Sequence, residues 1–248
     1  MSKEPTLDEL WNSATFSQRS FDPDQLSTFP DAVRRYLEHA ISRGAMLASS
    51  VRLRMHGEIK LRGWLPFTGE EVIYWNDGMI WSATVRMFGM PIRGFDRLLN
   101  RKGAMRWKLL GIIPVVSASG LDITRSAVGR VMAESVWLPS VLAGDGVSWT
   151  AQDSFHINAH LKWQDETGEL ALTIDDKGRF KGLSMQRWAN TEGGAFRYLD
   201  FGGVVEEEGR FAGYTIPTRL RIGWHFRKGR FEQDGEFFRV KVDDAAYR

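Results

Sequence analysis

The chain has 248 residues, 43% of them hydrophobic, so it can bury a large core, and a β-rich chain of this length is often a single domain. Thirty-three basic residues against 31 acidic residues give a net charge of +2, which argues against a nucleic-acid-binding protein. Cysteine is absent, which excludes disulfides, thiolate metal sites and cysteine nucleophiles.

Two helices are predicted near the N-terminus. Thr6 and Glu9 form a capping box that opens a short helix. Pro30 and Asp31 open a second helix, and Gly44 is its expected stop. Its apolar stripe is Val33, Tyr36, Leu37, Ala40 and Ile41. We therefore expect an N-terminal arm over residues 1–28 and one domain over 29–248. Residues 1–14 lack the apolar stretch of a signal peptide, so a cytoplasmic protein is expected.

From Val51 onwards the hydrophobic period changes from that of a helix to that of a strand. Alternation with one polar face runs over residues 51–62 and is typical of antiparallel sheets, because parallel strands are buried on both faces. It recurs over residues 79–87, 105–109, 155–163, 170–174 and 220–226. Glycine-containing turns are predicted between strands at 76–78, 167–168, 176–178, 208–209, 228–229 and 234–235.

One further helix is predicted within this run of strands, at about 124–137. Its apolar stripe is Val128, Val131, Met132 and Val136, with Thr124 as N-cap and Pro139 as the stop. Helices this few cannot cover the apolar faces of roughly ten strands, so the sheet has to curl on itself. The predicted fold is mainly β (α+β): a single strongly curved antiparallel sheet, a half-barrel meander with a few helices covering its concave side.

A curled sheet of this kind either packs solid or encloses a cavity. The chain has 10 tryptophans, which suit the wall of a cavity for a lipid-like or aromatic ligand and equally suit a packed core. Both alternatives stay open at this point.

Few residues carry recognisable chemistry. Arg130 and Glu134 lie four residues apart on the predicted helix and form either a surface ion pair or a contact to a ligand headgroup. His156 and His160 lie on a strand, where the spacing is too wide for one metal ion. Motifs for hydrolases, phosphate loops and dinucleotide binding are missing from the sequence, so no metal and no cofactor is expected. The basic run from Arg86 to Lys108 suits phosphates or anionic lipid headgroups, or simply the wet face of strands.

The segment from residue 94 to 142 resembles an uncharacterised bacterial protein family. The resemblance is carried by Asp96, Gly103, Met105, Arg130, Glu134, Trp137 and Pro139, with further matches at Phe29, Pro30, Val33, Arg34, Trp64, Pro66, Phe67, Trp81, Ile216, Pro217 and Trp224. It implies a fold similar to that of the periplasmic lipoprotein carriers (LolA-like), an open curved sheet whose concave side holds an apolar cavity under helices.

The first functional hypothesis is a binding protein, without assumed catalysis, for a hydrophobic or amphipathic molecule such as a lipid. The expected ligand-binding residues are Trp81, Met105, Trp107, Trp137 and Trp224 on the wall and Asp96, Arg130 and Glu134 as polar contacts. A second hypothesis is an enzyme acting on such a molecule, with Glu134 or Asp96 as general base. A third is a peripheral module that contacts anionic membranes or a protein partner through residues 86–108.

Overall fold

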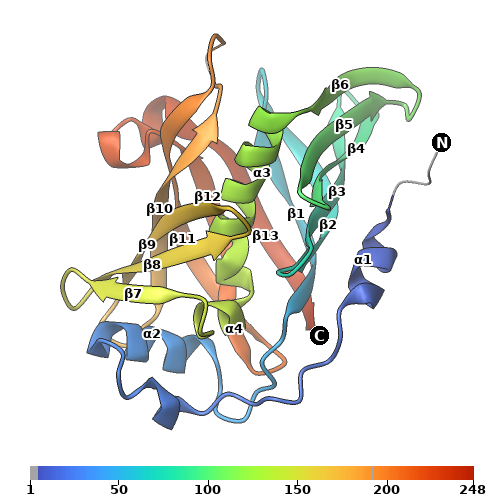
Figure 1. Ribbon diagram of the computed structural model, residues 1–248. Helices are drawn as coiled ribbons and strands as arrows, with labels where there is room; N and C mark the ends of the chain where they lie inside the picture. The colour runs from blue at the N-terminus through green and yellow to red at the C-terminus, as the bar shows by residue number, and fades with distance from the viewer. Residues whose placement is uncertain (1–4, 192) are drawn as a thin grey trace.

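The computed structural model describes residues 5–191 and 193–248. Over these residues a 13-stranded sheet forms in the order β6-β5-β4-β3-β2-β1-β13-β12-β11-β10-β9-β8-β7. Every pair of neighbours is antiparallel, and β13 returns to pair with β1, so the two halves of the chain share one sheet. β6 and β7 are its two edges, so the sheet curves around its concave side without closing into a barrel (Figure 1).

The strands follow the predicted alternation closely. Their bounds are β1 Ser50–Lys60, β2 Trp64–Tyr74, β3 Gly78–Met87, β4 Met90–Leu99, β5 Lys102–Leu109, β6 Ile113–Ser119, β7 Ser148–Ala151, β8 His156–Trp163, β9 Glu166–Ile174, β10 Phe180–Ala189, β11 Arg197–Phe211, β12 Tyr214–Trp224 and β13 Glu236–Tyr247. The predicted fold class is confirmed, because the structure is mostly strand in a single open antiparallel sheet.

Helices are short and serve to cover the sheet. Their bounds are α1 Leu7–Ser13, α2 Asp31–Ala40, α3 Leu121–Glu134 and α4 Pro139–Leu142, with short 3-10 or π turns at Pro23–Leu26, Ser135–Trp137, Phe226–Lys228 and Phe231–Gly235. α3 lies across the concave side of the sheet (Figure 1). In the described part of the chain, no helix has the length and hydropathy needed to cross a membrane.

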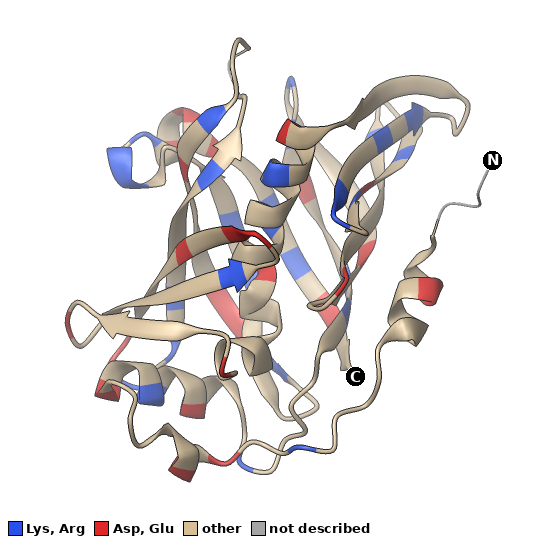
Figure 2. Ribbon diagram, in the orientation of Figure 1, with Lys and Arg blue, Asp and Glu red and all other residues tan. Residues whose placement is uncertain are grey.

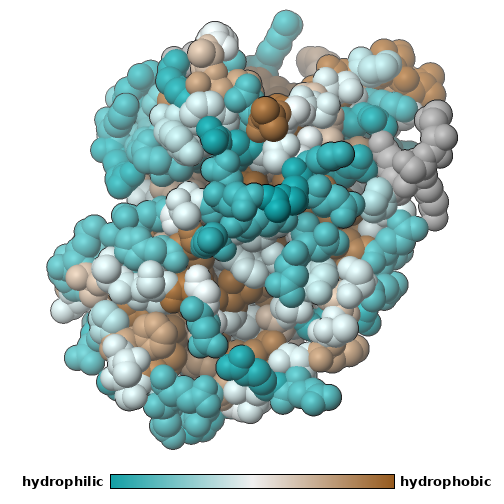
Figure 3. Space-filling model, in the orientation of Figure 1, coloured by the Kyte–Doolittle hydropathy of each residue, from teal (hydrophilic) through white to brown (hydrophobic). Residues whose placement is uncertain are grey.

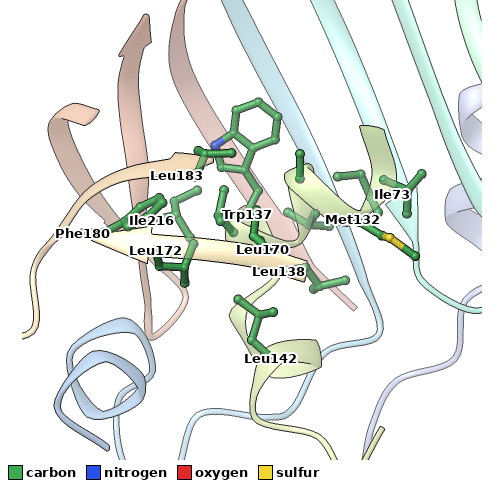
Figure 4. Packing of buried hydrophobic residues seen from close by; sticks show 14 of the residues in the cluster. Ile73, Met132, Trp137, Leu138, Leu142, Leu170, Leu172, Phe180, Leu183 and Ile216 are labelled. Carbon is green, nitrogen blue, oxygen red and sulfur yellow. The ribbon is translucent and has the colours of Figure 1, made fainter. Parts of the chain in front are cut away.

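The main core lies beneath the C-terminal end of α3. The stripe predicted for this helix is confirmed, since Val128, Val131, Met132 and Val136 are all buried. Figure 4 shows Met132, Leu138 and Leu142 beside Leu170 and Leu172, which come from the opposing strand β9. Burial on this scale is the main force that holds the helix on the sheet.

α1 packs on the opposite face of the sheet. The predicted capping box is present, with the Glu9 amide donating to Thr6 Oγ1 at 3.2 Å. Leu10 packs in a separate cluster with Val72, Ile80 and Leu99. The first four residues of the expected arm over 1–28 lie outside the described residues.

Helix boundaries differ from the predictions. α3 begins at Leu121, so Thr124 lies inside the first turn and is not the N-cap. The Thr124 hydroxyl donates to the Gly120 carbonyl and accepts from the Gly103 amide. Pro139 opens α4 rather than ending α3, since proline fits the first turn of a helix. α2 ends at Ala40, before Gly44, because Ile41 is extended and bridges to Tyr214.

Two predicted turns lie inside strands. The β8–β9 hairpin turns at 164–165 rather than at 167–168. Gly168 lies inside β9 against the side chain of Met132, whose sulfur would lie 2.6 Å from a Cβ at this position. The β11–β12 hairpin turns at 212–213 rather than at 208–209, because both turn residues adopt positive φ.

Two strand ends also differ. Phe155 lies before β8 and is 47% exposed. Phe226 lies beyond β12, because His225 adopts a left-handed conformation and ends the strand. The turn at 176–178 is confirmed, with Gly178 at φ +79°.

Candidate functional site

A cavity of about 320 Å³ lies between α3 and the concave face of the sheet. It is formed by inward-facing residues of successive strands and by one face of α3. The back wall from β1, β12 and β13 is apolar and consists of Met55, Ile59, Leu220, Ile222, Trp224, Phe237 and Phe238. The charged residues of the lining come from α3, β2, β4 and β10: Arg130, Glu134, Glu71, Asp96, Arg97 and Arg187.

The structure brings the predicted site residues together. Seven of them line this cavity: Trp81, Asp96, Met105, Arg130, Glu134, Trp137 and Trp224. Trp107 lies one layer behind, where its ring packs 5.4 Å from Trp81 and its Nε1–H donates to Asp96 Oδ1 at 2.9 Å. The indole of Trp137 donates to the Pro217 carbonyl at 3.0 Å, which fixes the end of α3 against β12.

Arg130 is the centre of the charged part of the lining. Its guanidinium donates from Nε to Glu134 at 2.6 Å, and its two terminal nitrogens bind Asp96 and Glu71, each at 3.0 Å. The same guanidinium lies 5.0 Å from the ring of Trp81. Of the two readings of Arg130 and Glu134, the surface ion pair is wrong, because both side chains are largely buried.

Burial changes the proton affinity of this cluster. Desolvation raises the pKa of Glu71 well above its usual value, and the nearby charge of Glu134 raises it further. Burial by itself would lower the pKa of Arg130, but the charges of Glu134, Glu71 and Asp96 together raise it. Arg130 is therefore a permanent cation, while Glu71 holds its proton into a higher pH range than an exposed glutamate.

Glu71 was missed by the sequence analysis, although a signal for it exists. Phe67, Gly69, Glu71 and Ile73 alternate along β2, so the register of the two apolar members places Glu71 on the inner face. Its side chain is 1% exposed. A carboxylate at an inward position of a strand is costly to bury unless a cation pairs with it, and Arg130 is that cation.

Arg187 was also missed. It lies on β10 in line with the buried Leu183 and Met185, and its stem passes under α3, where a Cβ on Gly129 would lie 3.1 Å from its Cγ. Its Nε donates to the Ser126 carbonyl at 3.3 Å. Burial lowers the pKa of Arg187 to about 10, and the charge of Arg130 acts in the same direction.

The enzyme hypothesis stays a prediction. Asp96 gives one oxygen to Arg130 and the other to Trp107, so both are occupied. Glu134 keeps one buried oxygen, Oε2, without a hydrogen-bond partner. In the described ranges no group of His, Asp or Glu side chains has the arrangement of a metal site. His156 and His160 instead lie beside Asp153 and Glu169.

Comparisons with known proteins give a family match and similar solved structures. The model of a family of unknown function, DUF6544, matches residues 19–233. Among solved structures, the chain is similar to a LolA superfamily protein from Nitrosomonas europaea, with a TM-score of 0.48 and 12% identity over 88% of this chain and 92% of that chain.

A second similar structure is a putative outer membrane lipoprotein-sorting protein domain from Vibrio parahaemolyticus. The TM-score is 0.41 and the identity 9%, over 81% of this chain and 86% of that chain. A comparison with curated proteins gives no match. The family match agrees with the resemblance, drawn from the sequence, to an uncharacterised protein family.

Proposed function

The chain belongs to DUF6544, a family of unknown function, and we propose that it binds one hydrophobic or amphipathic small molecule in the cavity beneath α3. The observation that carries this proposal is the cavity itself. It measures about 320 Å³ and combines an apolar aromatic wall with a few charged groups. Small-molecule sites occupy about 300–1,000 Å³ and combine the same features.

The wall favours an apolar ligand body. Trp224 stacks on Phe237 at 5.9 Å, and Trp81 packs edge-on against Phe238, also at 5.9 Å. Rings of this size are rigid and lose little entropy when they cover a ligand. Apolar surface that enters the cavity gains about 25 cal/mol per Å² removed from water.

The first test is native mass spectrometry of the purified protein, followed by organic extraction and identification of the bound compound. We expect one molecule of a lipid, fatty acid or isoprenoid per chain. A protein that carries nothing, and that also fails to bind an added fluorescent fatty acid, would contradict the proposal.

A bulky residue on α3 should block the cavity. Ala127 lines it, so Ala127→Trp is expected to lower the affinity for the fluorescent fatty acid by about tenfold or more, because the indole takes the space of the ligand. Ala151→Trp is the matched control, since Ala151 is exposed on the edge strand β7. Equal affinities for the two variants would place the ligand elsewhere.

The hypothesis of membrane contact gains support from an exposed apolar patch. We call this the β5–β6 tip: Phe88, Met90, Leu110, Ile112, Ile113, Val115 and Val116, which are all exposed. The turns after β3 and β5 lie side by side, because the Leu110 amide donates to the Pro91 carbonyl at 2.9 Å. Figure 3 shows hydrophobic residues gathered over this end of β6.

Charge favours an anionic lipid surface as the occupant of this patch. Between residues 86 and 120 seven basic residues face a single acidic residue, Asp96, which is bound inside the cavity. Figure 2 shows basic residues along β5, next to the tip. A patch of apolar side chains beside lysine and arginine fits the boundary between headgroups and acyl chains, where each basic residue adds about 1 kcal/mol.

Sedimentation with vesicles tests this second proposal. At low salt we expect binding to vesicles rich in phosphatidylglycerol and not to phosphatidylcholine alone. Ile112 is 73% exposed and is expected to insert into the lipid bilayer. Ile112→Asp is therefore expected to weaken binding to these vesicles by at least about tenfold. Phe155→Asp, an exposed residue away from the tip, serves as control. A dimer that ignores vesicles would assign the patch to a second copy of the chain and overturn the lipid proposal.

A further inference from the structure

Arg187 is a partly buried cation held in a fixed position at the edge of the cavity. Its stem packs against Gly129, and its guanidinium carbon lies 4.9 Å from the ring of Phe201 and 5.7 Å from that of Trp224. The bond from Nε to Ser126 fixes the plane of the guanidinium. The side chain is therefore ordered before any ligand arrives, which reduces the entropy cost of binding.

Arg187 differs from Arg130 in its partners. Arg130 gives all three nitrogens to carboxylates. Within the described ranges, no carboxylate forms a salt bridge with Arg187, and its two terminal nitrogens donate no hydrogen bond to the protein. Glu134 and Asp96 act on its pKa only through their charge, and the larger effect of the Arg130 charge opposes them.

Partial burial of a cation that has no counter-ion costs free energy, and a bound anion offsets that cost. We infer that the two terminal nitrogens of Arg187 bind the anionic headgroup, carboxylate or phosphate, of the molecule held in the cavity. This inference rests on the proposed function and adds the chemical class of the ligand. A guanidinium binds both headgroups through paired hydrogen bonds.

The layout of charge also orients such a ligand. Glu134, Asp96 and Glu71 surround Arg130 and would repel an anion there, whereas Arg187 lies beside aromatic rings. The apolar wall from β1, β12 and β13 continues from Trp224 and is free for an alkyl chain. The headgroup is thus placed at Arg187 and the tail along the back wall.

Three probes with the same chain length test the inference: dodecanoate, dodecyl phosphate and dodecanol. Affinities are measured by quenching of tryptophan fluorescence for the wild type and for Arg187→Met, which keeps the stem and removes the charge. We expect the wild type to bind at least one anion about tenfold more tightly than dodecanol, and Arg187→Met to lose that preference while its affinity for dodecanol stays unchanged.

Controls separate the possible failures. Arg125→Met removes an exposed arginine of α3 and should behave as the wild type. Arg187→Lys keeps the charge but not the paired N–H donors of the guanidinium. We expect its affinity for the anions to lie between those of the wild type and Arg187→Met. The ratio of the affinities for dodecanoate and dodecyl phosphate shows whether the site prefers a carboxylate or a phosphate headgroup. If the wild type binds dodecanol as tightly as both anions, this inference is wrong and the cavity proposal stands. If none of the three probes binds, both are overturned.

Discussion

Replacing Arg130 by methionine is expected to lower the free energy of unfolding by about 3–5 kcal/mol near pH 8, because it leaves buried carboxylates without their cation. Glu71, Asp96 and Glu134 all bind this one guanidinium, and the side chain of Arg130 is only 16% exposed. Urea unfolding followed by tryptophan fluorescence measures the loss.

The loss should depend on pH with a definite sign. The charge of Arg130 lowers the raised pKa of Glu71, so without Arg130 this carboxyl is still easier to protonate in the folded state than in the unfolded state. The folded state then holds more protons, so stability falls as pH rises above about 4, the range in which free carboxylates ionise. The deficit of Arg130→Met is therefore expected to shrink between pH 8 and pH 5.

Arg125→Met is the matched control, because Arg125 lies on the same helix and makes an exposed ion pair with Glu166. We expect it to cost no more than about 1 kcal/mol. An Arg130→Met variant as stable as this control at pH 8 would show that the cluster is solvated rather than buried.

Much of the fold could be predicted from local signals. Alternation along β1 and β3 and the stripe on α3 are properties of single segments, and both are confirmed by burial. Errors arise where packing against a distant residue decides the local structure. Gly168 looks like a turn residue in the sequence, but it lies inside β9 and packs against Met132. Phe155 has the right period but lies just before the first residue of its strand.

Only the part of the site that depends on local spacing could be predicted from the sequence. Arg130 and Glu134 are neighbours on one helix, so their pairing follows from spacing alone. Glu71 and Arg187 reach the cavity from β2 and β10, on opposite sides of the sheet centre, and only the three-dimensional arrangement brings them to α3. Their inward positions could be read from alternation, but their partners could not.

Replacing Glu71 by glutamine is expected to raise stability above neutral pH and to flatten its dependence on pH. Burial raises the pKa of Glu71, so its contribution is fully present below about 4.3, the usual value for a free glutamate, and is lost as pH rises through the raised value. Within that window the wild type loses up to about 1.4 kcal/mol per pH unit from this group. Glutamine cannot ionise, so the free energy of unfolding of the variant does not fall with pH at this position.

Glutamine also preserves the geometry around Arg130. Its carbonyl can accept the hydrogen bond that Arg130 now gives to Glu71 at 3.0 Å, and its amide can donate toward Glu134. Stability is measured by urea unfolding from pH 4 to pH 9. We expect equal stability at pH 4 and a growing advantage of Glu71→Gln as pH rises. Glu70→Gln is the matched control, since Glu70 is the adjacent residue and its exposed carboxylate binds Arg52. Parallel curves for the wild type and Glu71→Gln would mean that Glu71 is ionised throughout, and the cavity would then hold one more negative charge than the raised pKa implies.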